Sequence, residues 1–299
     1  MESNPSPPPQ NPNRNWAELP GDVIALILSK IGAIEMLVSA QFVCSSWCNV
    51  CKDPATWRSI NVLPDGDYYN TRTYNLEALC KNAVDRSCGG LVSLRIEYIA
   101  TDSLINYVSH RAKNLKQLRI VSSYSLGDEA LAEAASRFPL LEELELSYCS
   151  LSKEALKGVA VSCPLLISLK LNCQGYKCPH VEDNDEALAI ANHMPNLRYL
   201  QIFGNRLTNH GVQAILNGCP HLEFLDLRQC FNVNLKGKLG RRCAEQIRDV
   251  RSPNDPTDDY PYNPELPEYV LSDEDDPYGF SDIEMVTDDA DDCYAFSDG

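Results

Sequence analysis

The chain has 299 residues, of which 44% are hydrophobic and 23% charged, enough for a buried core with appendages. Its net charge of −16 is concentrated at one end, because residues 251–299 hold 16 Asp or Glu and one Arg, a net charge of −15. The nearly neutral remainder argues against a broad basic surface for nucleic acid. The thirteen cysteines follow no secretory leader, and the longest purely aliphatic run, residues 23–28, is too short to span a bilayer. We expect a protein of the nucleus or cytoplasm that binds neither nucleic acid nor membranes.

The N-terminal segment changes in character after its first 14 residues. Residues 1–14 contain five prolines among Asn, Ser and Gln, so they cannot bury enough surface to offset their ordering entropy and are expected to be a disordered leader. Leu19 and Pro20 then introduce a helix, which Gly32 is expected to end. Apolar residues form one face of this helix at i, i+1, i+4, i+5 and i+8: Val23, Ile24, Ile27, Leu28 and Ile31.

Two shorter apolar segments follow, at residues 36–40 and 42–50, and together residues 15–60 are small for an independent core. Such a unit needs a partner surface or a docked neighbour. Its distinctive residues occur in the order Trp16-x-x-Leu19-Pro20, Ile27-Leu28, Val43-Cys44, Trp47 and Asp53-Pro54-x-x-Trp57. In this pattern the segment resembles an F-box, a three-helix unit that binds a Skp-family adaptor and so joins a cullin-RING ubiquitin ligase. The alternative is an amphipathic cap that closes the N-terminal end of a repeat array.

The resemblance also implies which residues meet the adaptor. In F-boxes these are the Leu-Pro pair and the apolar residues of the first helices. Here they correspond to Leu19, Pro20, Val23, Ile24, Ile27 and Leu28.

An L-x-x-L-x-L pattern recurs through residues 61–250. Its first leucines are spaced by 24, 26, 25, 31 and 25 residues: Leu91, Leu115, Leu141, Leu166, Leu197 and Leu222. This period is typical of leucine-rich repeats, in which each unit supplies a strand and a helix that bury their apolar faces by stacking on neighbours. A degenerate first strand is expected at residues 57–62, with its helix at residues 76–83.

Helical apolar spacing between the later strands completes the fold prediction. The expected helices are residues 102–110, 128–136, 153–161, 185–192 and 211–217, several led by an Asp that favours the first turn. The fold class is therefore α/β, with a curved parallel sheet and outer helices. Cys149, Cys230 and the Cys-Pro pairs at 163–164 and 219–220 resemble the cysteine-containing repeats of F-box proteins, and residues 241–253 resemble the ending of plant F-box/LRR proteins.

The alternation of residues along each strand indicates the side chains on the concave face. Three aromatic residues gather on the last two strands, and the predicted substrate site is Tyr199, Phe203, Phe224 and Arg228. One alternative is that the C-terminal tail covers these residues. Another places recognition around Arg95, Arg119 and residues 174–184.

Residues 251–299, where the leucine pattern stops, are expected to form a disordered acidic tail whose removal from residue 254 leaves stability nearly unchanged. Because the tail also contains tyrosines and phenylalanines, its partial docking on the folded chain is an alternative. Ser272 and Ser281 precede acidic residues and could serve an acidophilic kinase; a solvated, unmodified tail is the alternative.

No catalytic or metal site is predicted, and no cofactor is expected. Cys173, Cys178, His180 and His193 form a weak metal-like cluster, which a loop insertion in the longest repeat also explains. Cys48-x-x-Cys51 falls on a predicted helix, where packing is sufficient explanation. A third hypothesis is an enzyme that uses the region from Cys173 to His193. Measuring the zinc bound to the purified protein would test it.

The resemblance implies a non-catalytic adaptor. The F-box would recruit the ligase, the repeats would bind the protein substrate, and a separate conjugating enzyme would transfer ubiquitin, so that proximity raises the effective concentration of the target lysine. The rival hypothesis is a non-ligase interaction scaffold whose F-box-like segment is only a cap.

Overall fold

The computed structural model describes residues 19–63, 74–174 and 181–262. Their helical elements are α1 (Gly21–Val38), η2 (Ala40–Phe42), α2 (Ser45–Lys52), η3 (Pro54–Trp57), α3 (Leu76–Arg86), α4 (Asp102–Arg111), α5 (Asp128–Ala135), α6 (Lys153–Ser162), α7 (Asp185–His193), α8 (Asn209–Gly218) and α9 (Lys238–Gln246). The strands are β1 (Ser59–Val62), β2 (Ser93–Glu97), β3 (Gln117–Val121), β4 (Glu143–Ser147), β5 (Ser168–Asn172), β6 (Tyr199–Gln201), β7 (Phe224–Asp226) and β8 (Asp249–Arg251). None of the described helices is long and apolar enough to cross a membrane.

The F-box segment packs directly on the first repeat. Gly32 adopts a φ of 83°, which breaks the helical path of α1 where the sequence predicts its end, although a second helical turn continues to Val38. The Trp57 ring is fully buried, and its Nε1 donates to the Cys51 carbonyl oxygen over 2.8 Å. Because α1 contacts α3 and β1, the segment forms one packed body with the array.

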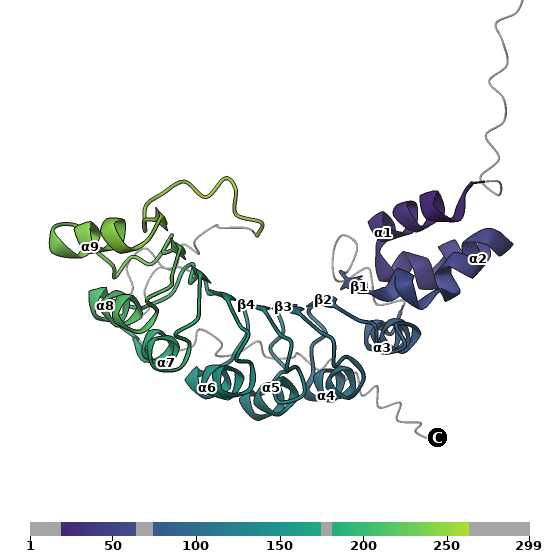
Figure 1. The fold of residues 1–299 in the computed structure, drawn as a ribbon, viewed down its shortest axis with the longest axis horizontal. Coiled ribbons are helices and arrows are strands. Elements are labelled where there is room, and N and C mark those ends of the chain that lie inside the picture. Colours follow the sequence, from purple (N-terminus) through teal and green to yellow (C-terminus); the bar gives the residue numbers. More distant parts are fainter. Residues whose placement is uncertain (1–18, 64–73, 175–180, 263–299) are drawn as a thin grey trace, which may run out of the picture. The chain divides into compact units, whose positions relative to one another are not determined.

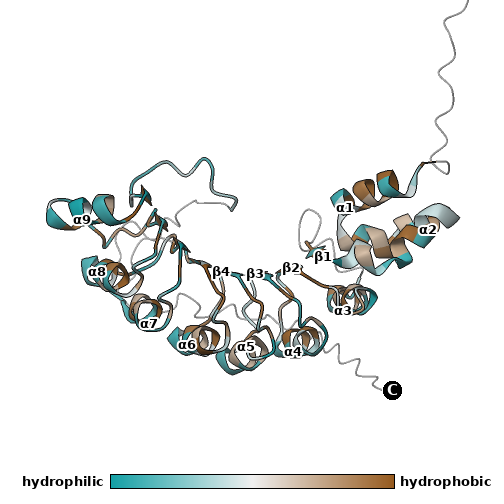
Figure 2. Cartoon of the chain, in the orientation of Figure 1, coloured by the Kyte–Doolittle hydropathy of each residue, from teal (hydrophilic) through white to brown (hydrophobic). Residues whose placement is uncertain are grey.

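The eight strands form one parallel sheet in the order of the sequence, β1 to β8. Its register aligns equivalent leucines of successive repeats, so that a buried ladder crosses the sheet: Leu94, Leu118, Leu144, Leu169, Leu200 and Leu225. Strands line one side of the array and helices the other, with apolar residues turned inward between them (Figures 1 and 2). The expected α/β fold of parallel sheet and outer helices is confirmed.

Residues that start the helices join each repeat to the next. Thr101, the residue before α4, caps that helix by accepting a hydrogen bond from the Leu104 amide, whereas Asp102 accepts from the Gly127 amide of the following repeat over 2.8 Å. Asp128 likewise accepts from the Ser152 amide. At these two positions the aspartates therefore act between repeats, in addition to the effect expected on their own first turn.

The C-terminal end of the array differs most from expectation. The sequence does not predict α9 or β8, although each adds a layer to the end of the stack. Residues 251–262, expected to be disordered, are packed against the sheet, and Tyr260 is only 7% exposed. The rest of the predicted tail, residues 263–299, lies outside the described residues, as does the expected leader.

Candidate functional site: two interaction surfaces

The residues expected to meet the adaptor divide into two groups. Ile24 and Leu28 are fully buried in the core, so they support α1 from within and the expectation that they contact a partner is wrong for this conformation. Leu19 and Ile27 are half-buried and pack against the core. Pro20 is exposed and Val23 partly so.

Further apolar side chains of the F-box are exposed, and the predicted adaptor contacts did not include them. They are Leu26 at 63%, Ile31 at 39%, Phe42 at 75% and Val43 at 56%. Together with Val23 we call them the F-box apolar surface. Ile31 belongs to the predicted apolar face of the helix but not to the predicted adaptor contacts, while Leu26 lies off that face and Phe42 and Val43 lie at the end of η2. The sequence does contain a signal for them, because the segment has more apolar residues than one helical face can bury. The remaining apolar residues must be exposed, and exposed apolar clusters mark contact sites.

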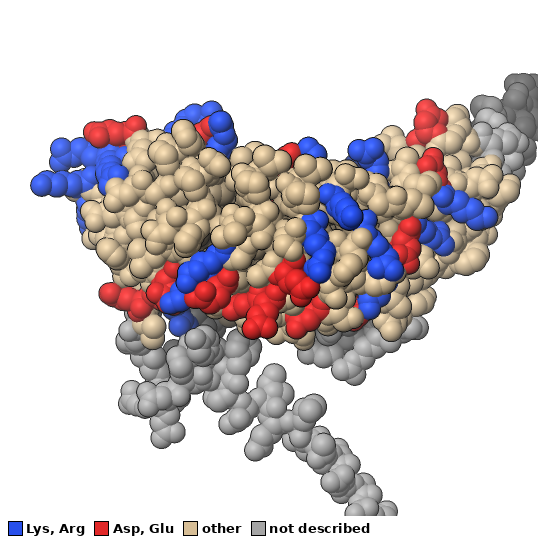
Figure 3. Space-filling view, turned by 60° about the horizontal axis from the view of Figure 1, so that its bottom comes forward, with Lys and Arg blue, Asp and Glu red and all other residues tan. Residues whose placement is uncertain are grey.

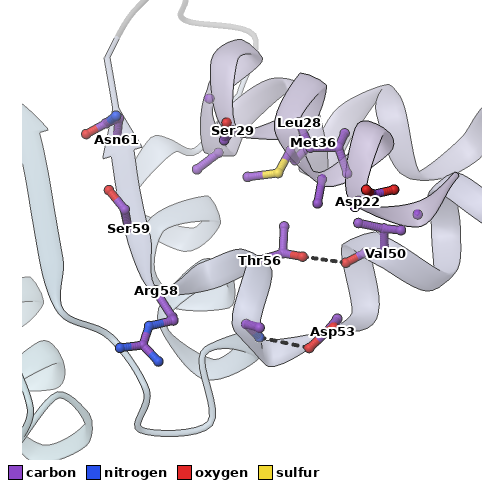
Figure 4. Close-up of a pocket in the computed structure, with 15 residues that line it drawn as sticks. Asp22, Leu28, Ser29, Met36, Val50, Asp53, Thr56, Arg58, Ser59 and Asn61 are labelled. Atoms are coloured by element: carbon purple, nitrogen blue, oxygen red, sulfur yellow. Dashed lines mark hydrogen bonds between the residues drawn. The ribbon is translucent and has the colours of Figure 1, made fainter.

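A pocket of about 560 Å³ lies between α1 and the segment from Asp53 to Asn61. Leu28, Met36 and Val50 give it an apolar lining (Figure 4). At its edge Thr56 donates a hydrogen bond to the Val50 carbonyl oxygen over 2.7 Å. The pocket thus shares one wall, α1, with the F-box apolar surface.

On the repeats, the strand face is the side of the sheet opposite the helices. Tyr199 of β6 and Phe224 of β7 are paired in register, and their rings stack with centroids 4.2 Å apart. Their predicted adjacency is confirmed, and both side chains remain half-buried. Lys170 lies 5.9 Å from the Tyr199 ring centroid, which gives the pair a cationic neighbour.

Phe203 and Arg228, the other two residues of the predicted substrate site, are not exposed. Phe203 is 1% and Arg228 4% exposed, because residues 252–262, which we call the C-terminal strap, cover them. Phe203 stacks on Tyr260 with ring centroids 3.7 Å apart and an interplanar angle of 4°. The expectation that these two side chains are open to a substrate is therefore wrong in the strapped state.

Arg228 holds the strap to the sheet. Its guanidinium donates to both carboxylate oxygens of the fully buried Asp226, at 2.8–3.1 Å. Nη1 also donates to the Pro256 carbonyl oxygen over 2.9 Å and to the Asp259 carboxylate. The hydrogen bond from Arg228 is the main reason that the pKa of Asp259 lies below its usual value. One arginine thereby neutralises a buried carboxylate and binds the strap.

Two strap tyrosines reach across the sheet to β4. The Tyr260 hydroxyl lies 2.9 Å from that of Tyr148, and the Tyr262 hydroxyl donates to the Glu145 carboxylate. Burial is the largest cause of the raised pKa of Tyr260 and Tyr262. Both phenols therefore remain protonated at physiological pH.

The strand face from β2 to β4 balances its own charges. Arg95 pairs with Glu97 at 2.6 Å, and Arg119 lies 3.8–3.9 Å from Glu143 and Glu145. Beneath the strap, a buried polar ladder links three strands through Ser147, Asn172 and Gln201. The strand face can thus offer aromatic and hydrogen-bonding groups without a dominant charge.

The matching family profiles correspond to these two parts of the chain. A profile described as F-box-like matches residues 16–62. One described as the LRR repeats of FBD-associated F-box protein At5g56370 matches residues 90–188, and one described as Leucine Rich repeat matches residues 193–216.

Relatives from Arabidopsis thaliana cover both parts together. F-box protein SKIP19 is 49% identical over 258 residues, which are 85% of this chain and 83% of that protein. F-box/LRR-repeat protein 22 is 47% identical over 83% of this chain and 80% of that protein. The chain belongs to the F-box/LRR-repeat proteins. F-box/LRR-repeat protein 23 is 51% identical over 82% of this chain, but the match spans only 55% of that protein, about half its length.

Six described cysteines of this F-box/LRR-repeat protein are buried, namely Cys51, Cys80, Cys163, Cys219, Cys230 and Cys243, whereas Cys88 is exposed. The thiols of Cys163 and Cys219 lie 3.5–3.8 Å from carbonyl oxygens of the preceding repeat, and burial raises the pKa of each to about 11. Protonated thiols are poor nucleophiles and metal ligands. F-box/LRR-repeat proteins are typically non-catalytic adaptors, and none of the matching families is enzymatic.

The described residues contain no group of three or more metal-ligating side chains. In the weak metal-like cluster, Cys173 directly follows β5 and His193 is exposed at the end of α7, whereas Cys178 and His180 lie outside the described residues. The helix side mixes acidic and basic side chains, with basic residues gathered at the α9 end (Figure 3).

Proposed function

We propose that this F-box/LRR-repeat protein is the substrate receptor of an SCF-type ubiquitin ligase. The F-box apolar surface binds a Skp-family adaptor, which connects the chain to a cullin-RING ligase, and the strand face binds the protein to be ubiquitinated. Such a receptor acts in the nucleus or cytoplasm and makes no covalent bond itself. The observation that carries the proposal is the exposed apolar cluster on a segment whose residues match an F-box profile.

Substitution of the most exposed residues tests the adaptor contact. Phe42→Ala with Val43→Ala should weaken adaptor binding by about ten-fold or more, because each large apolar side chain lost from an interface costs about 1.5–3 kcal/mol. Folding should be preserved, since both side chains are already largely exposed. Binding of purified chain to a Skp-family adaptor can be measured by calorimetry.

Val161→Ala is the matched control, because Val161 is 81% exposed on α6, outside the F-box segment. It should bind the adaptor as the wild type does. Undiminished binding by the Phe42, Val43 variant would contradict the assigned surface. Absence of adaptor binding by the wild type would favour the non-ligase scaffold.

A further inference from the structure

The strap occupies the strand face as a bound peptide would. It contains no helix or strand. Its contacts with the array include the Phe203–Tyr260 stack, an edge-on contact between the Tyr148 and Tyr262 rings, the hydrogen bonds of two tyrosine hydroxyls, the Gln229 amide bonded to the Pro253 carbonyl oxygen, and the binding of Asp259 by Arg228. These contacts span four strands, β4 to β7, since Tyr262 contacts Glu145 of β4 and Tyr260 contacts Tyr148 just after it, while Arg228 follows β7. The contacts of the strap therefore indicate which chemical groups this part of the strand face binds.

We propose that Phe203, Tyr148, Arg228 and Glu145 form a socket for a protein segment that turns as the strap does and carries an aspartate followed directly by a tyrosine, and that Asp259-Tyr260 of the strap occupies this socket in competition with the substrate. This inference rests on the proposed function, because it names the class of substrate that the strand face recognises.

Each member of the socket recognises a different group of the bound segment. Phe203 stacks on the tyrosine ring, and Tyr148 hydrogen-bonds the hydroxyl of that ring. Arg228 binds the preceding carboxylate together with a main-chain carbonyl three residues earlier, at Pro256. Glu145 accepts from a second tyrosine two residues beyond the first. Because these groups stand at fixed positions along the segment, the socket should recognise a sequence motif and not acidic chains in general.

Two members of the socket, Arg228 and Glu145, also have partners within the repeats. Arg228 is held by Asp226, so its guanidinium is already oriented and one nitrogen faces the strap. Glu145 receives a hydrogen bond from the Ser147 hydroxyl at 3.1 Å and lies near Arg119 and Lys170. Groups that are preorganised in this way lose little entropy when a ligand binds.

A substrate must compete with a segment of the same chain, whose effective concentration is on the order of millimolar. It can do so by making contacts that the strap leaves unused. The stacked Tyr199 and Phe224 are half-buried, and Lys170 lies beside them. We expect segments that fill only the socket to displace the strap only when they are in excess over that concentration, and those that also reach Tyr199 and Phe224 to displace it at lower concentrations.

Peptide binding to a full-length chain with an opened socket tests the proposal. The variant carries Asp259→Ala, Tyr260→Ala and Tyr262→Ala, which remove the strap side chains and leave every socket residue intact. The probe is a fluorescent peptide with the sequence of residues 252–262, and its control carries Asp259→Asn and Tyr260→Ala. Fluorescence polarisation should show the probe binding the opened variant at least about ten-fold more tightly than it binds the wild type, and than the control peptide binds the variant. Equal binding of probe and control would overturn the proposal.

A second measurement uses the wild-type chain and does not depend on the folding of the variant. The Asp255 and Tyr260 amides donate to Ser252 and Thr257 carbonyl oxygens within the strap. Excess probe peptide should speed hydrogen exchange in residues 252–262 at least two-fold, and the control peptide should not; no difference between the two peptides would contradict competition.

Adaptor binding of the same samples separates this inference from the proposed function. Loss of the peptide effect with normal adaptor binding would refute the socket alone. Peptide binding without adaptor binding would refute the ligase role and keep the socket.

Discussion

Glu186 of α7 is a carboxyl group that the fold holds away from water. Burial raises its pKa to about 7, Asp183 and Asp185 add to the rise, and a hydrogen bond from Asn205 at 2.5 Å opposes it. A glutamate has a pKa of about 4.3 when unfolded. The folded state therefore binds the proton more tightly, and between these two pKa values its stability falls as the pH rises.

Glu186→Gln should remove this pH dependence. We expect the wild type to lose about 1–3 kcal/mol of unfolding free energy relative to the variant between about pH 5 and 8, with partial exposure of the side chain favouring the lower figure. Asn205 can still donate to the amide oxygen of Gln. Urea denaturation at several pH values measures the unfolding free energy of both proteins. If this free energy changed with pH in the same way for the wild type and the variant, Glu186 would be ionised at little cost.

Arg228 illustrates why the substrate site was only partly predictable. Strand alternation placed it on the strand face, and its position follows β7 as expected. Its burial depends on Asp259, 31 residues later in a segment without any apolar periodicity. Local patterns report which way a side chain points, but they contain no signal for a distant polar segment that covers it.

At the scale of elements, the helices and strands were predictable because each repeat presents the same pattern. Five expected helices differ from α4 to α8 by at most two residues at either end, and the flanking residues identified the strands. α9 was missed because few apolar residues mark its face, of which Leu239 and Cys243 are buried.

Helix spacing in the stack gives an element-scale prediction. A Cβ at Gly218, the last residue of α8, would lie 2.0 Å from the Ala191 carbonyl oxygen of α7. Gly218→Ala should therefore destabilise the chain by about 1–3 kcal/mol through overpacking, although alanine favours helices. Asn192→Ala, at an exposed position of α7, should change stability by less than about 0.5 kcal/mol. Thermal denaturation can compare the two, and a stabilised Gly218 variant would mean that the helices separate at little cost.

At the scale of the whole molecule, the repeats form a stack in which each strand pairs only with its sequence neighbours. The strap is the exception, because Tyr260 contacts Tyr148 across 112 residues and Tyr262 contacts Glu145 across 117. Residues 254–262 therefore belong to the folded unit. We no longer expect their removal to leave stability unchanged, and instead expect it to destabilise the chain.

Deletion of residues 254–299 should lower the melting temperature. Tyr260 alone buries a ring whose loss costs about 1.5–3 kcal/mol, which is roughly 3–12 °C in a chain of this size. Deletion of residues 263–299 is the control and is expected to have little effect, as the acidic composition of that segment suggests. Differential scanning calorimetry measures both, and equal melting temperatures for the two truncated chains would show that the strap adds nothing to stability.

The long-range contacts of the strap also bear on the order in which the chain folds. An array with nearest-neighbour contacts can form one repeat at a time as synthesis proceeds. The strap is made after β8 and can dock only when β4 and the repeats up to β8 already stand in register, because its tyrosines bind at one end of that interval and its Asp259 binds Arg228 near the other. The strap therefore docks only on a complete set of intervening repeats. Once docked, it links these repeats, so that they should unfold together and exchange their amide hydrogens as one cooperative unit.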